Sequence, residues 1–133
     1  KRGGGAKPLD LEEAEGRYLA DAPGGETAER SYDRHWALTV MDTAMRRLRE
    51  EARTGGKDAA FERLSAFLSR EPEPGEYEQL APVLRMNVGA VAVAVFRLRR
   101  RYRELVRSIV ADTVARPSDL EAELRHLIEV LRV

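Results

Sequence analysis

Apolar residues recur along most of this chain at intervals of three and four, the spacing that places them on one face of an α-helix. Short runs rich in Gly, Pro, Asn or Asp separate five such segments. The pattern therefore predicts an all-α fold, a helical bundle without a strand of useful length. The expected helices lie near residues 27–53, 58–69, 76–84, 88–114 and 119–132.

The predicted helix ends rest on capping residues. Thr27, Asp58 and Asn87 each stand just before or at the start of an apolar repeat, where a side-chain oxygen satisfies a free backbone N–H. Ser118-Asp119-Leu120-Glu121 has the spacing of a capping box and opens the last helix.

Each predicted helix has one face expected to be buried. Those faces comprise Ala37, Val40, Met41, Ala44 and Leu48; Phe61, Leu64, Phe67 and Leu68; Tyr77, Leu80, Ala81 and Leu84; Val91, Val95, Leu98, Tyr102, Leu105 and Ile109; and Leu120, Leu124, Leu127, Ile128 and Leu131.

Residues 1–26 are rich in glycine and poor in apolar residues, so we expect a linker or tail there. Residues 27–133 are then one domain with a C-terminal extension helix.

Composition excludes several classes of protein. The 133 residues contain no cysteine, which excludes disulfides and thiol chemistry. The longest strongly apolar run, Val88 to Phe96, is too short to span a bilayer, and the N-terminus lacks the apolar segment of a signal peptide. We therefore expect a cytoplasmic protein with no membrane association. Because the chain does not begin with Met, we also expect it to be part of a longer protein.

No residue pattern suggests catalysis, a metal or a cofactor. His35 and His126 are isolated from other metal-ligating types, and Gly3-Gly4-Gly5 is not followed by the Lys of a phosphate-binding loop. Ser65, Ser108 and Thr113 lack a His and Asp pattern around them. We expect a protein that is not an enzyme.

The centre of the chain has the parts of a helix-turn-helix: the short helix 76–84, the turn Arg85-Met86-Asn87 and a longer helix. In such a motif the first helix braces against the DNA backbone and the second presents its first turns to the major groove. Although the whole chain has a formal net charge of zero, residues 97–107 hold six arginines and one glutamate, a charge of +5. This cluster suits phosphate contacts, but a solvated helix face beside acidic neighbours explains the charge equally well.

Several segments together resemble one family. They are Tyr77-Glu78-Gln79-Leu80-Ala81, Gly89-Ala90-Val91, Arg97-Leu98-Arg99-Arg100-Arg101-Tyr102-Arg103-Glu104-Leu105, Arg34-His35-Trp36-Ala37-Leu38, Lys1-Arg2-Gly3-Gly4, Ala115-Arg116-Pro117 and Glu123-Leu124-Arg125-His126-Leu127. In their order and spacing along the chain they resemble the C-terminal promoter-reading domain (region 4) of bacterial extracytoplasmic-function sigma factors. Lys1-Arg2-Gly3-Gly4 resembles the end of the core-binding region that precedes this domain, and the last two segments resemble the C-terminal extension of one group within the family. The resemblance covers nearly the whole chain.

The resemblance implies a domain that binds the upstream (minus-35) promoter element and contacts core RNA polymerase, with an anti-sigma protein as a further partner. We expect the family's core-binding region, which engages polymerase most strongly and melts DNA, to be absent from this chain. The implied DNA-binding residues are Tyr77, Asn87, Gly89, Ala90, Ala92, Val93, Phe96, Arg97, Arg100 and Arg101. Among them we expect Arg97, Arg100 and Arg101 to dominate affinity through phosphate contacts.

Three departures from the family bear on that function. Arg85 occupies a turn position that usually holds Gly and often needs a positive φ, which costs a non-Gly residue about 1 kcal/mol. Pro82 lies inside the third helix, which it is expected to kink or shorten. The run from Val88 to Phe96 is apolar where the family usually has polar, base-facing residues.

That apolar run supports a second interpretation. Val88, Ala92, Val93 and Phe96 fall on faces that should be exposed, and they offer thymine-methyl contacts but no hydrogen bond to a base. Exposed apolar surface often marks a protein interface. The recognition face is then a self-association or protein-binding surface, with a homodimer as the simplest case. Helix 119–132 or the N-terminal tail could cover the same residues, or the long helix could be more buried than in the family.

Overall fold

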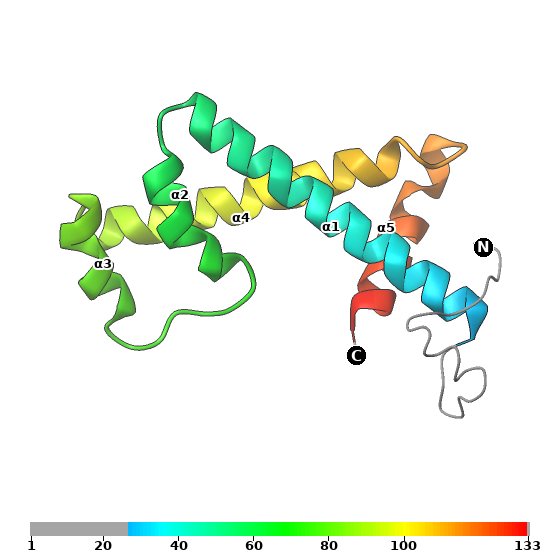
Figure 1. Cartoon of the computed structure of the whole chain (residues 1–133), viewed down its shortest axis with the longest axis horizontal. Helices are drawn as coiled ribbons and strands as arrows, with labels where there is room; N and C mark the ends of the chain where they lie inside the picture. The colour runs from blue at the N-terminus through cyan, green and yellow to red at the C-terminus, as the bar shows by residue number, and fades with distance from the viewer. Residues whose placement is uncertain (1–26, 133) are drawn as a thin grey trace. The chain divides into compact units, whose positions relative to one another are not determined.

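The computed structural model describes residues 27–132, and every regular element among them is helical (Figure 1). Their order is α1 (Ala28–Thr54), α2 (Asp58–Leu64), the 3-10 helix η1 (Ser65–Leu68), α3 (Glu76–Leu84), α4 (Val88–Ala111), the 3-10 helix η2 (Pro117–Asp119) and α5 (Leu120–Leu131). The predicted all-α class is confirmed. The predicted N-terminal tail lies outside the described residues.

The chain divides into two compact units. Among the described residues, one contains 27–42 together with 110–132, and the other contains Thr43–Ile109. The candidate functional residues all lie in the second unit, hereafter the central unit.

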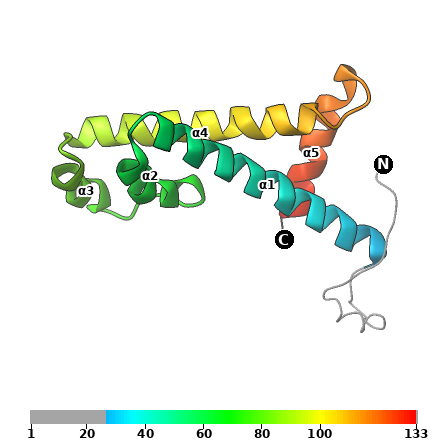
Figure 2. The ribbon, with the colours of Figure 1, turned by 45° about the horizontal axis from the view of Figure 1, so that its top comes forward.

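Two connected groups of buried side chains form the core of the central unit. The first brings Leu64 and Phe67 against Ala81, Val91 and Val95. The second joins Ala44, Leu48, Phe61 and Leu105. Within this unit, α2 and α3 both lie beside the N-terminal half of α4, as the two ribbon views agree (Figures 1 and 2). The faces predicted to be buried supply these groups, so the helical periodicity identified the core correctly.

The turn between α3 and α4 is closed by backbone hydrogen bonds. Arg85 adopts the left-handed conformation, with φ 57° and ψ 46°. Its N–H donates to the Pro82 carbonyl at 3.2 Å, and the Met86 N–H donates to the Ala81 carbonyl at 2.9 Å. This is a Schellman cap, in which a left-handed residue reverses the chain and satisfies the last helix carbonyls. The expected positive φ at Arg85 is therefore present, and the hydrogen bonds of the turn offset its conformational cost.

The two helices that this turn joins are bent by 95° relative to each other. Pro82 does not shorten α3, because the helix reaches Leu84, the predicted last residue. Among the described residues no single helix is both long and apolar enough to cross a membrane, although α3 and α4 taken together reach that length and composition across their bend.

Two predicted helices end earlier than expected. The helix predicted over 58–69 tightens into a 3-10 turn at Ser65, where the Ser65 hydroxyl donates to the Glu62 carbonyl at 3.4 Å. The helix predicted over 88–114 stops at Ala111. There the Thr113 N–H and hydroxyl both donate to the Val110 carbonyl, at 2.9 and 2.8 Å, so this acceptor no longer serves a continuing helix.

The predicted caps divide into two that form and two that do not. The Thr27 Oγ1 accepts a hydrogen bond from the Arg30 N–H at 3.1 Å, and the Asn87 Oδ1 accepts one from the Ala90 N–H at 2.7 Å. The cap at Asp58 is wrong, because Lys57 is the N-cap residue and no side chain caps α2. The capping box at Ser118 is also wrong, because Pro117 starts a 3-10 turn and α5 begins only at Leu120, uncapped by a side chain.

In the other unit, Leu127 of α5 is buried as predicted. The prediction that Ile128 is buried is wrong, because its side chain is 55% exposed. The His126 ring stacks on the Trp36 ring with centroids 5.8 Å apart, and its Nε2 lies 3.2 Å from the Oδ2 of buried Asp33. His126 is thus a packing residue with a carboxylate neighbour.

Candidate nucleic-acid interface

The first turns of α4 expose apolar side chains, as predicted from the sequence. Val88, Val93 and Phe96 are 38%, 46% and 59% exposed, and Ala92 is also exposed. Val91 and Val95, which alternate with them, are buried in the core. The long helix is therefore no more buried here than its helical pattern required.

Asn87 and Tyr77 have structural roles in this region. Asn87 caps α4 through its Oδ1, which leaves its side-chain N–H groups available to a ligand. A Cβ at the neighbouring Gly89 would lie 3.4 Å from that oxygen, an ordinary van der Waals distance, so the cap does not itself require glycine there. Tyr77 is half-buried, and its ring meets the Phe67 ring edge-on at a centroid distance of 5.3 Å. Its ring therefore belongs to the core.

Arg101 is held by two carboxylates. Its Nε and NH2 donate to the two Glu51 oxygens at 2.9 and 2.6 Å, and its NH1 donates to Glu104 Oε1 at 3.2 Å. The hydrogen bonds from Arg101 lower the pKa of the Glu51 carboxyl, and those to Glu51 and Glu104 raise the pKa of Arg101. A phosphate therefore competes for this guanidinium with Glu51, near the end of α1, and with Glu104.

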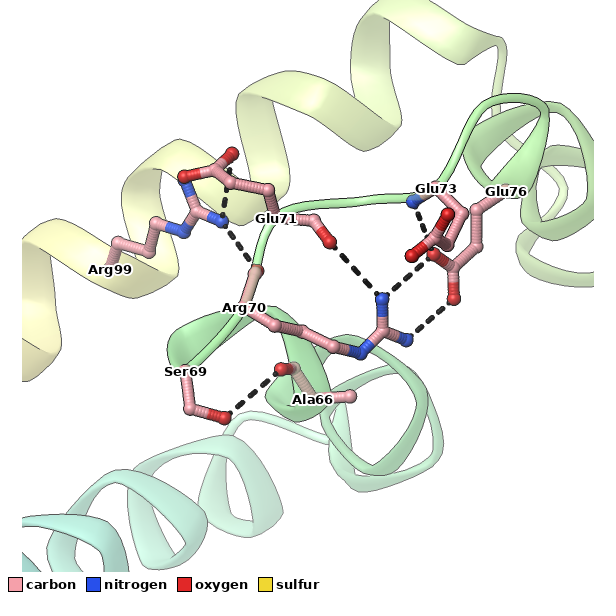
Figure 3. Close-up of polar contacts among 7 residues, drawn as sticks. All are labelled: Ala66, Ser69, Arg70, Glu71, Glu73, Glu76 and Arg99. Carbon is pink, nitrogen blue, oxygen red and sulfur yellow. Dashed lines mark hydrogen bonds and ion pairs between the residues drawn. The ribbon is translucent and has the colours of Figure 1, made fainter.

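Arg99 points to the loop that precedes α3 instead of to solvent. Its Nε donates to the Phe67 carbonyl at 2.7 Å and its NH2 to the Arg70 carbonyl at 3.0 Å. Glu71 Oε1 lies 3.7 Å from the same NH2 (Figure 3). These carbonyls end η1 and begin the loop. Arg99 therefore fastens the loop to α4, a role that the sequence does not reveal.

The same loop is closed by a second arginine. Arg70 donates through NH1 and NH2 to the two Glu76 oxygens at 2.9 and 2.6 Å, and the Glu73 N–H donates to Glu76 Oε1 at 2.8 Å (Figure 3). These donors lower the pKa of Glu76 to about 2, with the Arg70 contribution the larger. The Arg70 guanidinium also lies over the Phe67 ring, 4.8 Å from its centroid. The network fixes where α3 begins.

Arg97, Arg100 and Arg103 of the cluster are more available. Arg100 Nε lies 3.5 Å from Glu104 Oε2, and both side chains are largely exposed. The side chains of Arg97 and Arg103 form no ion pair or hydrogen bond with any residue that the structure describes. Acidic neighbours thus engage Arg99, Arg100 and Arg101, so the two sequence interpretations of the cluster each fit part of it.

A groove of about 750 Å³ lies beside the first turns of α4, in the central unit. Its walls come from the end of α1, from α2 and from α4. Half of the predicted DNA-binding residues line it: Gly89, Ala90, Val93, Arg97 and Arg101. Tyr77, Asn87, Ala92, Phe96 and Arg100 do not. Sequence reasoning missed this groove and its wall residue Lys57, because no local pattern shows how three helices meet.

Comparisons with known protein families, with curated proteins and with solved structures find no match to this chain.

Proposed function

We propose that this chain is the promoter-reading DNA-binding domain of a sigma-type transcription initiation factor, acting through a helix-turn-helix formed by α3 and α4. The family resemblance described above motivates the sigma-type assignment. Core RNA polymerase and an anti-sigma protein are the further partners that it implies.

One observation carries the proposal: the geometry of the turn. Two helices joined by three residues and bent by 95° match a helix-turn-helix, whose helices meet at about 90–120°. The left-handed residue that such a turn needs is at Arg85, the position where the resembling family usually has Gly. The polar network around Arg70 and Arg99 holds α3 against α4, which favours a fixed angle between them.

On this proposal, different parts of α4 contact the phosphates and the bases of the DNA. Arg97, Arg100 and, after release from Glu51, Arg101 neutralise phosphates, which supplies affinity without regard to sequence. The exposed Val88, Ala92, Val93 and Phe96 contact thymine methyl groups, and the free side-chain N–H groups of Asn87 donate to a base edge or phosphate. With so few base-reading donors, sequence discrimination is weaker than in a domain with polar residues at those positions.

The test is selection of bound sequences from a pool of random duplexes, followed by measurement of the affinity for the selected duplex across salt concentrations. We expect a short T-rich consensus and binding that weakens steeply with salt. Absence of any enriched sequence, together with binding no stronger than that of a variant lacking Arg97, Arg100 and Arg101, would refute the proposal.

A second candidate function is self-association or protein binding through Val88, Ala92, Val93 and Phe96. The exposure of Phe96 and Val93 favours it, since covering a large apolar side chain is worth on the order of 1.5–3 kcal/mol. It predicts a homodimer that Phe96→Glu with Val93→Arg converts to a monomer without loss of helix content. Light scattering after size-exclusion chromatography distinguishes the two functions, because a monomer at high concentration contradicts the homodimer.

A further inference from the structure

The groove described above is long, and one side of it is a regular stripe of α4. The α4 residues that line it include Gly89, Val93, Arg97 and Arg101, which follow one another at intervals of four. At a rise of 1.5 Å per residue this stripe is about 18 Å long. The groove therefore suits an elongated molecule lying along α4.

Small residues line much of the groove, which leaves space beside the helices. They are Gly89, Ala90 and Ala94 of α4, Ala52 of α1 and Ala60 of α2. Larger apolar side chains, among them Phe61, Leu64, Met86 and Leu98, form the rest of its apolar surface. An apolar body in the groove would be removed from water on several sides, which is favourable in proportion to the area covered.

The charged side chains at the groove are not balanced. Glu51 and Arg101 neutralise each other through their paired hydrogen bonds. Lys57 and Arg97 also line the groove, and neither side chain pairs with a residue in the described part of the chain. The groove thus combines an apolar surface with two uncompensated positive charges, which complements a molecule with an apolar body and one negative end.

We propose that this groove binds an amphipathic organic anion, of the class of single-chain aliphatic carboxylates. The carboxylate pairs with Arg97, with Lys57 as a second cation at the groove, and the aliphatic chain lies along Val93 and the small residues of α4. A volume of about 750 Å³ is within the range of about 300–1,000 Å³ typical of small-molecule sites, which likewise combine apolar walls with a few polar groups.

The bound anion also regulates the proposed function, and this part of the inference rests on that function. Gly89, Ala90 and Val93 belong to the predicted DNA-reading turns and line the groove at the same time. An anion there covers part of the reading surface and occupies Arg97, a predicted phosphate contact. DNA and the anion therefore exclude each other, and the anion lowers DNA affinity without unfolding the domain.

The test titrates the full chain with dodecanoate, below its micelle concentration, and follows backbone amides by NMR. We expect saturable shifts at Gly89, Ala90, Val93 and Ala94, with dodecanol binding about fivefold or more weakly because it lacks the charge. Val93→Asp should weaken dodecanoate binding more than about tenfold, and Arg97→Gln about fivefold. In matched controls, Val83→Asp and Arg63→Gln leave binding unchanged, since both residues are exposed and neither lines the groove.

Three results would overturn the anion site: equal binding of dodecanol and dodecanoate, shifts insensitive to Val93→Asp, or groove signals that move with protein concentration alone. The last would mean that a second copy of the chain fills the groove. Competition is measured separately, by adding dodecanoate to the complex with the selected duplex. Saturable dodecanoate binding that leaves DNA affinity unchanged overturns the exclusion and counts against α4 as the DNA-reading helix, while the anion site itself stands.

Discussion

From Val88 to Phe96, α4 exposes only apolar side chains and glycine, whereas from Arg97 to Arg107 it exposes only charged ones. The buried stripe is continuous across both halves, with Val91 and Val95 in the first and Leu105 in the second. The core therefore does not explain the change. An apolar surface followed by a charged one along the same helix suggests two tasks. The first half contacts an apolar or methyl-bearing partner, and the second half attracts phosphates.

The largest expected effect comes from the charged half. Replacing Arg97, Arg100 and Arg101 by Gln should raise the dissociation constant for DNA on the order of a thousandfold, with each of the three charged contacts worth on the order of tenfold. The slope of log affinity against log salt should flatten by roughly 2 to 3, at about 0.9 per phosphate contact. Fluorescence anisotropy with a labelled duplex measures both quantities.

The control removes the same charge elsewhere, through Arg30→Gln, Arg63→Gln and Arg125→Gln on α1, α2 and α5. An equal loss in this control would mean that net charge, and not the α4 surface, attracts DNA. A changed sequence preference with an intact salt slope would contradict the assignment of these arginines to phosphates.

The next effect is a difference in the free energy of unfolding between variants of two arginines in the charged half, Arg99 and Arg103. Arg99→Met keeps an apolar stem but leaves the Phe67 and Arg70 carbonyls without their charged donor, and should lower the free energy of unfolding by about 2 kcal/mol. Arg103→Met, on the same helix but without a hydrogen bond to a described residue, should change it by less than about 0.5 kcal/mol. Urea unfolding followed by circular dichroism provides both values, and equal losses would contradict the anchoring role of Arg99.

Glu51→Gln sharpens the comparison in the opposite direction. It removes the bidentate partner of Arg101, and should strengthen DNA binding by up to about fivefold, because an exposed ion pair is worth about 0.2–1 kcal/mol. Glu62→Gln removes the same charge from a pair with Arg49, which is not on α4, and serves as the control. Weaker DNA binding by the Glu51 variant would mean that Glu51 orients Arg101 for DNA instead of withholding it.

The smallest effect concerns pH and the loop before α3. The pKa of Glu76 is lowered from 4.5 to about 2, so its carboxylate stabilises the fold above about pH 4.5 and this contribution disappears as the pH falls toward 2. Thermal unfolding of the parent and of Glu76→Gln should therefore differ most above pH 4.5 and converge near pH 2. Glu78→Gln, in the same helical turn, should show no such pH-dependent difference, and a similar difference there would contradict the assignment.

The sequence predicted the helices well where periodicity and local caps decide them. The bounds of α3 and the start of α4 follow from the turn around Asn87, and the exposure of Val93 and Phe96 follows from the helical spacing of their buried neighbours. In contrast, α2 gives way to η1 at Ser65, whose hydroxyl donates to the nearby Glu62 carbonyl, and the Phe67 carbonyl of η1 accepts a hydrogen bond from Arg99, thirty-two residues further along the chain. Local propensity contains no information about that second contact.

The candidate site was predictable to a similar extent. The charge run could be counted, but its division into engaged and available arginines depends on partners distant in sequence. Glu51 is fifty positions from Arg101, and Arg99 reaches across to the loop at Arg70. The groove likewise needs α1, α2 and α4 in their folded arrangement. The sequence alone therefore assigns one role, phosphate contact, to all of these arginines, although in the folded chain some of them bond to protein groups and others do not.

The most direct test of the central claim is to map the DNA contact on the folded chain by NMR. Backbone amides of the full chain are followed while the selected duplex is added. We predict that the largest shifts lie from Asn87 to Arg101, covering both halves of α4, and that amides of α5 change little. Saturation of binding with no shift in α4, or with the largest shifts in α5, would contradict the account.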